Sequence, residues 1–199
     1  MKTYTSIICL LFVYVLNTSL TFAQSPIPSS TIQIETTLLA APEMYRADAK
    51  VIGYNSNGEL ITLREGNNGI VCLADDPNKK GFNVACYSIE LEDYMARGRA
   101  LIAEGKSEKE KREIRKKEID DGILKMPSTP AAVYVLSAKE EDYNMETGEL
   151  ENTKLRYVFY KPYMTAEETG LPTRPSEPGM PWLMDPNTHR SHIMITPAP

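Results

Sequence analysis

The chain has 199 residues, of which 42% are hydrophobic and 25% charged, and its formal net charge at pH 7 is −5. This length supports one domain with a substantial core, and the mild acidity disfavours a nucleic acid or an anionic membrane as the partner. The sequence lacks the G-x-S-x-G, H-E-x-x-H, S-x-x-K and C-x-x-C-H motifs and any phosphate-binding glycine loop. These absences argue against the common hydrolase, NTPase and cytochrome classes.

Residues 1–23 have the features of a cleavable export signal. Lys2 supplies a positive start, residues 7–16 form an apolar run, and the small residue Ala23 precedes Gln24. The apolar run is too short for a membrane-spanning helix, and the mature chain has no transmembrane candidate. We therefore expect an exported protein, periplasmic or secreted after cleavage near Ala23.

Residues 24–34 are rich in proline and serine, so we expect a flexible leader followed by a short helix within residues 35–46. The pattern then becomes that of β-strands at residues 50–54 and 59–64. Between them, Asn57-Gly58 supplies the positive φ values of a tight hairpin turn. With the two strands that follow, these signals predict four antiparallel strands in meander order.

Two apolar, strand-like runs at residues 70–74 and 82–87 flank a polar turn, and each contains one cysteine. In an antiparallel pair, Cys72 and Cys86 would face each other within reach of a disulfide. An oxidising compartment favours a disulfide. A catalytic or metal-binding cysteine pair is the alternative, but the C-x-x-C spacing of redox and zinc motifs is absent.

After Tyr87 the apolar period becomes about 3.6 residues, which predicts an amphipathic helix ending near Gly105. Ser107 and Glu110 form a capping-box pattern that starts a second, highly charged helix. We expect a helical hairpin over about residues 89–124. Acids alternate with the basic residues of the second helix, so we interpret these as a solvated face without a nucleic-acid role.

Residues 131–137 and 153–160 have the valine and tyrosine content of strands. Eight of the fourteen prolines follow, within residues 161–199, where they disfavour regular structure. The apolar residues of this segment argue that it docks on the domain, and residues 192–196 are a candidate last strand.

The expected fold class is α+β. A mostly antiparallel sheet of about five to seven strands would carry the helical hairpin on one face, with a Pro-rich irregular C-terminal segment. Residues 35–199 would form a single domain, in which residues 161–199 are a docked tail.

Both histidines of the chain, His189 and His192, lie close in sequence to Asp185. Imidazole and carboxylate groups are good zinc ligands, and they can also serve as a general base and its orienting acid. However, H-x-x-H on a proline-punctuated loop is a weak motif, so we favour structural roles for both rings.

Asp75 and Asp76 are a second set of candidate metal ligands, for calcium or for an ion shared with the histidines. The D-x-D-x-D spacing of a calcium loop is missing, and Asp-Asp-Pro-Asn is ordinary turn chemistry. The aromatic residues Trp182, Tyr160 and Tyr163 are candidates for a ligand groove, although such residues also lie at the edges of cores.

Two classes of function remain. The favoured one is a non-catalytic binding or structural module of the cell envelope, with an unidentified protein or small molecule as partner. The alternative is a small exported metal-binding protein or hydrolase-type enzyme centred on Asp185, His189 and His192. The sequence identifies no cofactor.

Overall fold

The computed structural model describes residues 26–198, so the predicted export signal lies outside the described residues. The helices are α1 (Ser30–Leu38), α2 (Glu43–Arg46), α3 (Glu92–Ala103), α4 (Glu108–Asp120) and α5 (Ala166–Thr169). The strands are β1 (Lys50–Tyr54), β2 (Leu60–Arg64), β3 (Ile70–Leu73), β4 (Phe82–Ser88), β5 (Ala131–Ala138), β6 (Lys154–Tyr160), β7 (Trp182–Met184) and β8 (His192–Ile195).

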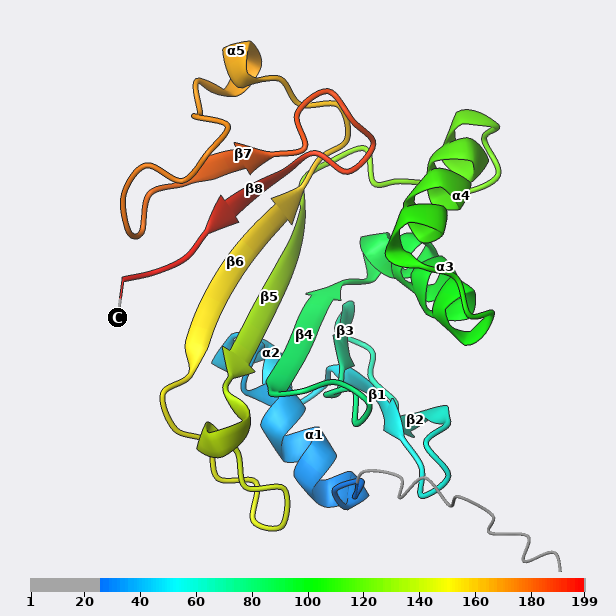
Figure 1. Cartoon of the computed structure of the whole chain (residues 1–199), viewed down its shortest axis with the longest axis vertical. Coiled ribbons are helices and arrows are strands. Elements are labelled where there is room, and N and C mark those ends of the chain that lie inside the picture. Colours follow the sequence, from blue (N-terminus) through cyan, green and yellow to red (C-terminus); the bar gives the residue numbers. More distant parts are fainter. Residues whose placement is uncertain (1–25, 199) are drawn as a thin grey trace, which may run out of the picture.

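The strands form one open sheet in the order β2-β1-β3-β4-β5-β6-β8-β7 (Figure 1). Only the β1–β3 pair is parallel within residues 26–198, so the mostly antiparallel α+β class is confirmed. The eight strands exceed the five to seven predicted. The additional strand is β7, which pairs with β8 at the edge of the sheet.

The start of the sheet departs from the predicted meander. β1 and β2 form the predicted hairpin, and the turn uses Gly58 at a φ of 78°. β3 then pairs with β1 in parallel, on the side away from β2, so the meander order is wrong. Gly66 allows this crossing, because a Cβ there would lie 2.2 Å from the backbone nitrogen of Lys50.

α1 begins at Ser30, inside the segment predicted to be a flexible leader. The Ser29 side chain caps it by accepting a hydrogen bond from the Ile32 N–H. Gln33 then joins the helix to the sheet, since its amide donates to the Tyr54 carbonyl and accepts from the Tyr54 N–H. This reciprocal pair of hydrogen bonds fixes α1 against β1.

The two faces of the sheet carry separate cores. α1 packs across β1 and its neighbouring strands (Figure 1), over a cluster formed by Ala40, Ala41, Ala49, Val51, Cys72, Phe82, Val84, Cys86 and Leu136. The opposite face carries the cluster of Ile52, Val71, Tyr87, Leu91, Ala131, Val133, Val158 and Met194. Side chains alternate between the faces along each strand, as the period of two requires.

Cys72 pairs directly with Cys86 in the β3–β4 ladder, with their Cα atoms 3.9 Å apart, and the two residues form a disulfide. This confirms the predicted pairing. Both cysteines are fully buried on the face that α1 covers.

The chain continues from β4 into α3, which packs against α4. The guanidinium of Arg97 in α3 binds the Glu118 carboxylate of α4, with an N–O distance of 2.8 Å in the ion pair. The predicted capping box of Ser107 and Glu110 is present at the start of α4. None of the helices between residues 26 and 198 has both the length and the apolar character needed to cross a membrane.

Candidate functional site

The loop between β7 and β8 brings together the residues predicted to carry chemistry. Asp185 follows β7, His189 lies within the loop, and His192 begins β8. The Thr188 hydroxyl holds the loop in a turn by donating to the Asp185 carbonyl, at 2.8 Å, and accepting from the Arg190 N–H, at 3.1 Å.

His192 is buried and oriented by two contacts. Its Nδ1 lies 2.6 Å from the Arg190 carbonyl oxygen. Because a carbonyl only accepts, this nitrogen carries the proton and donates. The ring stacks on Tyr160, with centroids 4.6 Å apart and an interplanar angle of 24°. Burial holds the pKa of His192 below its ordinary value, so the ring is neutral at pH 7.

His189 lies in the same region and is 5% exposed. Its ring meets the edge of Tyr94 in α3, with centroids 6.2 Å apart. Within residues 26–198, its Nε2 has no hydrogen-bond partner. Burial lowers the pKa of His189, and the nearby charges of Arg190 and Arg115 lower it further.

Arg115 of α4 is a buried cation that also contacts Tyr94. It is 8% exposed, and the central carbon of its guanidinium lies 4.0 Å from the centre of the Tyr94 ring. Gly98 of α3 leaves room for it, since a Cβ there would come within 3.0 Å of its Nη1. Among the described residues, no carboxylate lies within ion-pair distance of Arg115.

Asp185 pairs with Arg190 within the loop. Its Oδ2 lies 3.0 Å from the Arg190 guanidinium, although the two groups are not aligned for a hydrogen bond. No hydrogen bond between residues 26 and 198 joins the Asp185 carboxylate to either histidine. The arrangement therefore lacks the carboxylate–imidazole bond that orients a general base.

Asp75 and Asp76 lie in the β3–β4 loop, at the opposite end of the sheet from the histidines. The strand register shows this, because Phe82 after the loop pairs with Ala138 at the far end of β5, whereas Tyr160 pairs with both Ala131 and His192. The two aspartates and the two histidines are therefore too far apart to share one ion.

The two aspartates stabilise the β3–β4 loop through hydrogen bonds and an ion pair. Asp75 accepts a 2.8 Å hydrogen bond from the Asn83 N–H, and burial raises its pKa to about 6. Asp76 accepts from the Asn78 N–H at 3.0 Å and forms an ion pair with Lys79. In the part of the chain that the structure describes, no three His, Cys, Asp or Glu side chains are placed to hold a metal ion.

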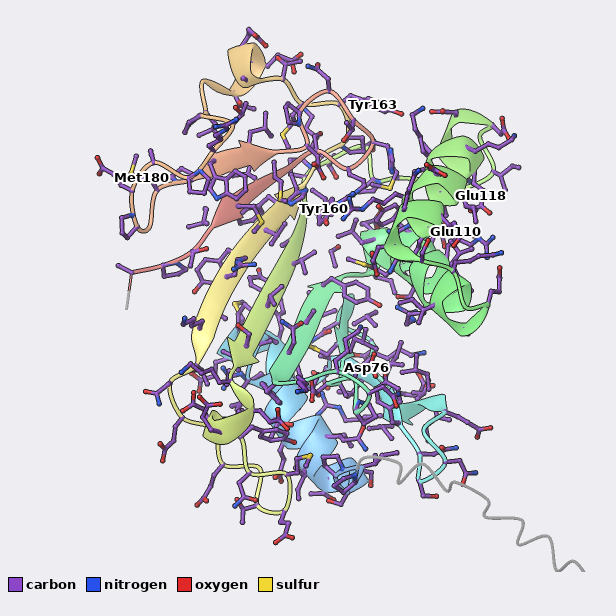
Figure 2. The ribbon with its side chains drawn as sticks, in the orientation of Figure 1. Asp76, Glu110, Glu118, Tyr160, Tyr163 and Met180 are labelled. Carbon is purple, nitrogen blue, oxygen red and sulfur yellow. A yellow bond between two sulfur atoms is a disulfide. The ribbon has the colours of Figure 1, made fainter. Side chains whose placement is uncertain are left out.

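A pocket of about 330 Å³ lies between α4 and the β7–β8 loop. We call it the basic pocket. Its charged side chains are Arg112, Glu113 and Lys116 of α4 and Asp185 and Arg190 of the loop, and Tyr163 and His189 also line it. Figure 2 shows Tyr163 on the chain segment that faces α4.

A second concavity, the apolar groove, has a volume of about 880 Å³. Its apolar walls are formed by Leu155, Met180, Trp182, Met184, Met194 and neighbouring prolines. In Figure 2, Met180 lies on the loop before β7 and Tyr163 lies near the β7–β8 loop, at the other end of the strand. The two linings share no residue, so the groove and the basic pocket are separate.

The three residues predicted to line one ligand groove are divided among different places. Trp182 lines the apolar groove, and Tyr163 lines the basic pocket. Tyr160 is part of the stack with His192. No local pattern in the sequence pointed to the three groove methionines, although Met194 and Trp182 become neighbours once β7 and β8 pair.

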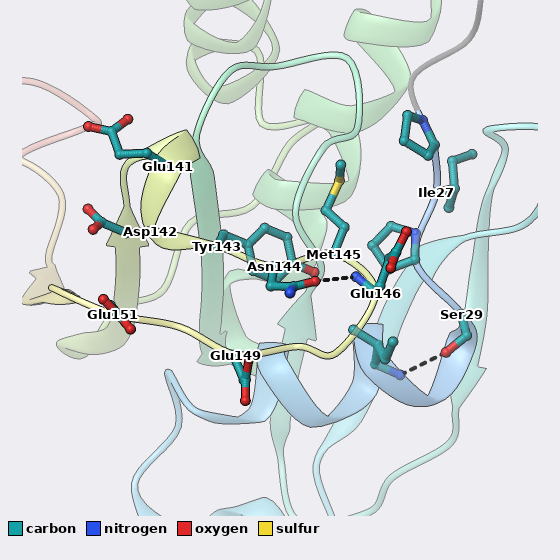
Figure 3. A pocket seen from close by; sticks show the side chains of 13 residues that line it. Ile27, Ser29, Glu141, Asp142, Tyr143, Asn144, Met145, Glu146, Glu149 and Glu151 are labelled. Atoms are coloured by element: carbon teal, nitrogen blue, oxygen red, sulfur yellow. Dashed lines mark hydrogen bonds between the residues drawn. The ribbon is translucent and has the colours of Figure 1, made fainter.

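A third pocket, of about 1000 Å³, lies between residues 26–29 and the loop of residues 141–151, and it is strongly acidic (Figure 3). The carboxylates of Glu141, Asp142, Glu149 and Glu151 point in different directions there. They do not converge on one cation, so this pocket offers no defined coordination.

Comparison with protein-family models, with curated proteins and with solved structures found no match to this chain. Function is therefore inferred from the pockets and side chains of the molecule itself.

Proposed function

We propose that the mature chain is an exported, non-catalytic binding module of the cell envelope that holds a small amphipathic ligand in the apolar groove. The groove is the observation that carries this proposal. Its volume of about 880 Å³ falls within the range of small-molecule sites, which are typically concave, mostly apolar and furnished with a few polar groups.

The apolar wall of the groove is built by strand pairing. Trp182 pairs with Met194, and Met194 pairs with Val158, so the three side chains project from the same face of the sheet. Methionine side chains are flexible and polarizable, and they adapt to apolar ligands of varied shape. Met180, on the loop before β7, also lines the groove and is half exposed.

Two cations give the groove a polar end. Lys154 and Arg156 of β6 line it, and neither is in an ion pair with another residue of the described chain. The one acid in the lining is Glu177. This charge favours a ligand with an apolar body and an anionic end, such as an alkyl carboxylate.

Two further features support a binding role in an exported protein. The Cys72–Cys86 disulfide is compatible with an oxidising compartment. The histidines are packed against tyrosines, and Asp185 is engaged by Arg190, which leaves them without the geometry of an acid–base pair.

Trp182 makes the proposal directly measurable, because it is the only tryptophan in the sequence. We expect dodecanoate to cause a saturable change in tryptophan fluorescence of the mature protein. Met180→Ser should weaken binding, whereas Met44→Ser, at a position 80% exposed and outside the groove, should leave it unchanged.

Arg156→Gln tests the polar end separately. It should weaken dodecanoate binding and leave binding of uncharged dodecanol unchanged. A fluorescence response that is absent, or that Met180→Ser and Met44→Ser reduce equally, would exclude the groove as the ligand site.

A further inference from the structure

We infer that the basic pocket binds a single oxyanionic group, a phosphate or a carboxylate, between α4 and the β7–β8 loop. This site is separate from the apolar groove and does not depend on the function proposed for the groove. Three features support it: charges that lack partners, a polar atom that lacks a hydrogen bond, and an unusual backbone around the pocket.

The charges on α4 are incompletely neutralised. Arg112 lines the pocket, and Arg115 is buried behind it. Neither has a carboxylate partner within residues 26–198. Burying a charge that lacks a carboxylate partner is costly, and Arg115 is compensated only by the Tyr94 ring and a 3.3 Å hydrogen bond to the Tyr94 carbonyl. An anion in the neighbouring pocket would lower this cost.

Each acid around the pocket lies within ion-pair distance of one cation. Asp185 forms the 3.0 Å ion pair with Arg190. Glu113 lies 3.9 Å from Lys109, and Asp120 pairs with Lys116. With each of these acids matched to one cation, the positive charges of Arg112 and Arg115 remain in excess, which favours a bound anion.

The pocket also contains unused hydrogen-bonding capacity. His189, a lining residue that is more than nine-tenths buried, has no partner for its Nε2 among the described residues. Its ring packs against the Tyr94 ring. Buried polar groups normally find partners, so an orphan beside a pocket is consistent with a ligand that supplies one.

The backbone around the pocket is held in a sparsely populated conformation. Four non-glycine residues between 26 and 198 have a positive φ, and three of them line this pocket: Tyr163 at 61°, Asp185 at 49° and Asn187 at 60°. The Tyr163 N–H donates to the Thr188 carbonyl at 2.8 Å, which ties the two segments together. Such strain persists where the surrounding structure fixes it, and it is concentrated at binding sites.

The test is titration of the mature protein with inorganic phosphate, and separately with acetate, at constant ionic strength in chloride. Binding is followed by calorimetry and by the imidazole NMR signals of His189. We expect one saturable site for at least one of the anions, with a dissociation constant of about 1 mM or tighter. Arg112→Gln should weaken binding about tenfold or more, because it removes a charge-assisted contact.

Lys117→Gln is the matched control, since Lys117 lies on the same helix, is highly exposed, pairs with Asp121 and is outside the pocket. It should bind the anion as the unmodified protein does. Lys116→Gln provides a second pocket variant if Arg112→Gln changes the circular dichroism spectrum. Absence of saturable binding for both anions, or equal weakening in Lys117→Gln and Arg112→Gln, would overturn the inference.

Discussion

The guanidinium of Arg115 lies 4.0 Å from the centre of the Tyr94 ring, so this buried cation contacts an aromatic face where a carboxylate would be usual. Desolvated cation–π contacts contribute about 2 kcal/mol. Tyr94 also packs against the His189 ring, so one ring contacts both the cation and the imidazole.

This contact predicts energetic coupling between the two residues. Tyr94→Leu should lower the free energy of unfolding more in the Arg115 background than in an Arg115→Met background, by about 1–2 kcal/mol. Urea unfolding of the four proteins of the double-mutant cycle measures the coupling. Additive effects would show that the ring does not stabilise the cation.

The disulfide should make a large contribution to stability. Cys72 and Cys86 are 14 residues apart, and a closed loop of about 15 residues contributes about 3 kcal/mol in the chain-entropy model. Reduction, or replacement of both cysteines by alanine, should lower the free energy of unfolding by about that amount. Urea unfolding with and without reductant measures the difference, and thiol titration confirms the redox state.

The alanine double variant is the control, because reductant should not change its stability. Loss of stability on reduction that is equal in the double variant would indicate an effect unrelated to the disulfide.

Asp75 should make stability fall as the pH rises. Burial raises its folded pKa to about 6, above an unfolded value of about 3.9. Between these two pKa values the folded state binds more protons than the unfolded state. The free energy of unfolding therefore decreases as the pH rises from about 4 to about 6. Partial exposure limits the effect to about 1 kcal/mol. Asp75→Asn should remove this decrease, as measured by urea unfolding at pH 4 and pH 7.

Asp76 is the matched control for this titration. Burial acts to raise its pKa, but the hydrogen bond from Asn78 and the Lys79 ammonium outweigh burial and lower it. Ionised Asp76 therefore stabilises the folded state at pH values above its unfolded pKa, and this stabilisation is lost as the pH falls through the folded pKa. Asp76→Asn should change stability in the opposite direction from Asp75→Asn at pH 7; equal changes would contradict the assignment.

Gly66 should tolerate no side chain. In Gly66→Ala the new Cβ would lie 2.2 Å from the Lys50 nitrogen and 2.4 Å from the Ala49 carbonyl carbon, so the parallel β1–β3 pair would have to move. We expect a loss of about 2–4 kcal/mol in the free energy of unfolding, measured by thermal or urea unfolding.

Gly105→Ala separates this clash from the effect of a positive φ. Gly105 has a φ of 74°, and a Cβ there would have no neighbouring atom within 4 Å, so the loss should be about 1 kcal/mol. Similar losses of stability in Gly66→Ala and Gly105→Ala would show that the close approach of Gly66 to β1 does not add to the cost of the substitution.

Local sequence signals account for the parts of the fold that were predicted correctly. The Asn57-Gly58 turn, the facing cysteines and the Ser107–Glu110 capping box each depend on residues close together in the sequence. Their chemistry specifies the local structure almost independently of the remaining chain.

The errors concern contacts between distant segments. The parallel β1–β3 pair requires the close approach of Gly66 to the Lys50 backbone. The position of α1 depends on the hydrogen bonds between the Gln33 side chain and the Tyr54 backbone. Neither interaction has a local pattern. The sequence pattern does not predict β7 either, because this short strand forms by pairing with β8, across a loop that contains proline.

The candidate site was only partly visible in the sequence. The proximity of Asp185, His189 and His192 was evident, but their contacts with Tyr94, Tyr160 and Arg190 arise from tertiary packing. Arg115 belongs to a charged helix that we interpreted as a solvated face, yet it is buried. Because acids alternate with the basic residues of α4, the sequence pattern does not distinguish Arg115, which contacts Tyr94, from the exposed cations of the helix.

The location of the disulfide beneath α1 sets an order of assembly. Both cysteines are inaccessible to solvent, and Cys86 Sγ lies 3.5 Å from the Thr37 carbonyl oxygen of the helix. An oxidant can reach the two thiols only while this helix is undocked. We therefore expect oxidation to precede docking of the N-terminal helix, and the docked helix to shield the bond from reductants.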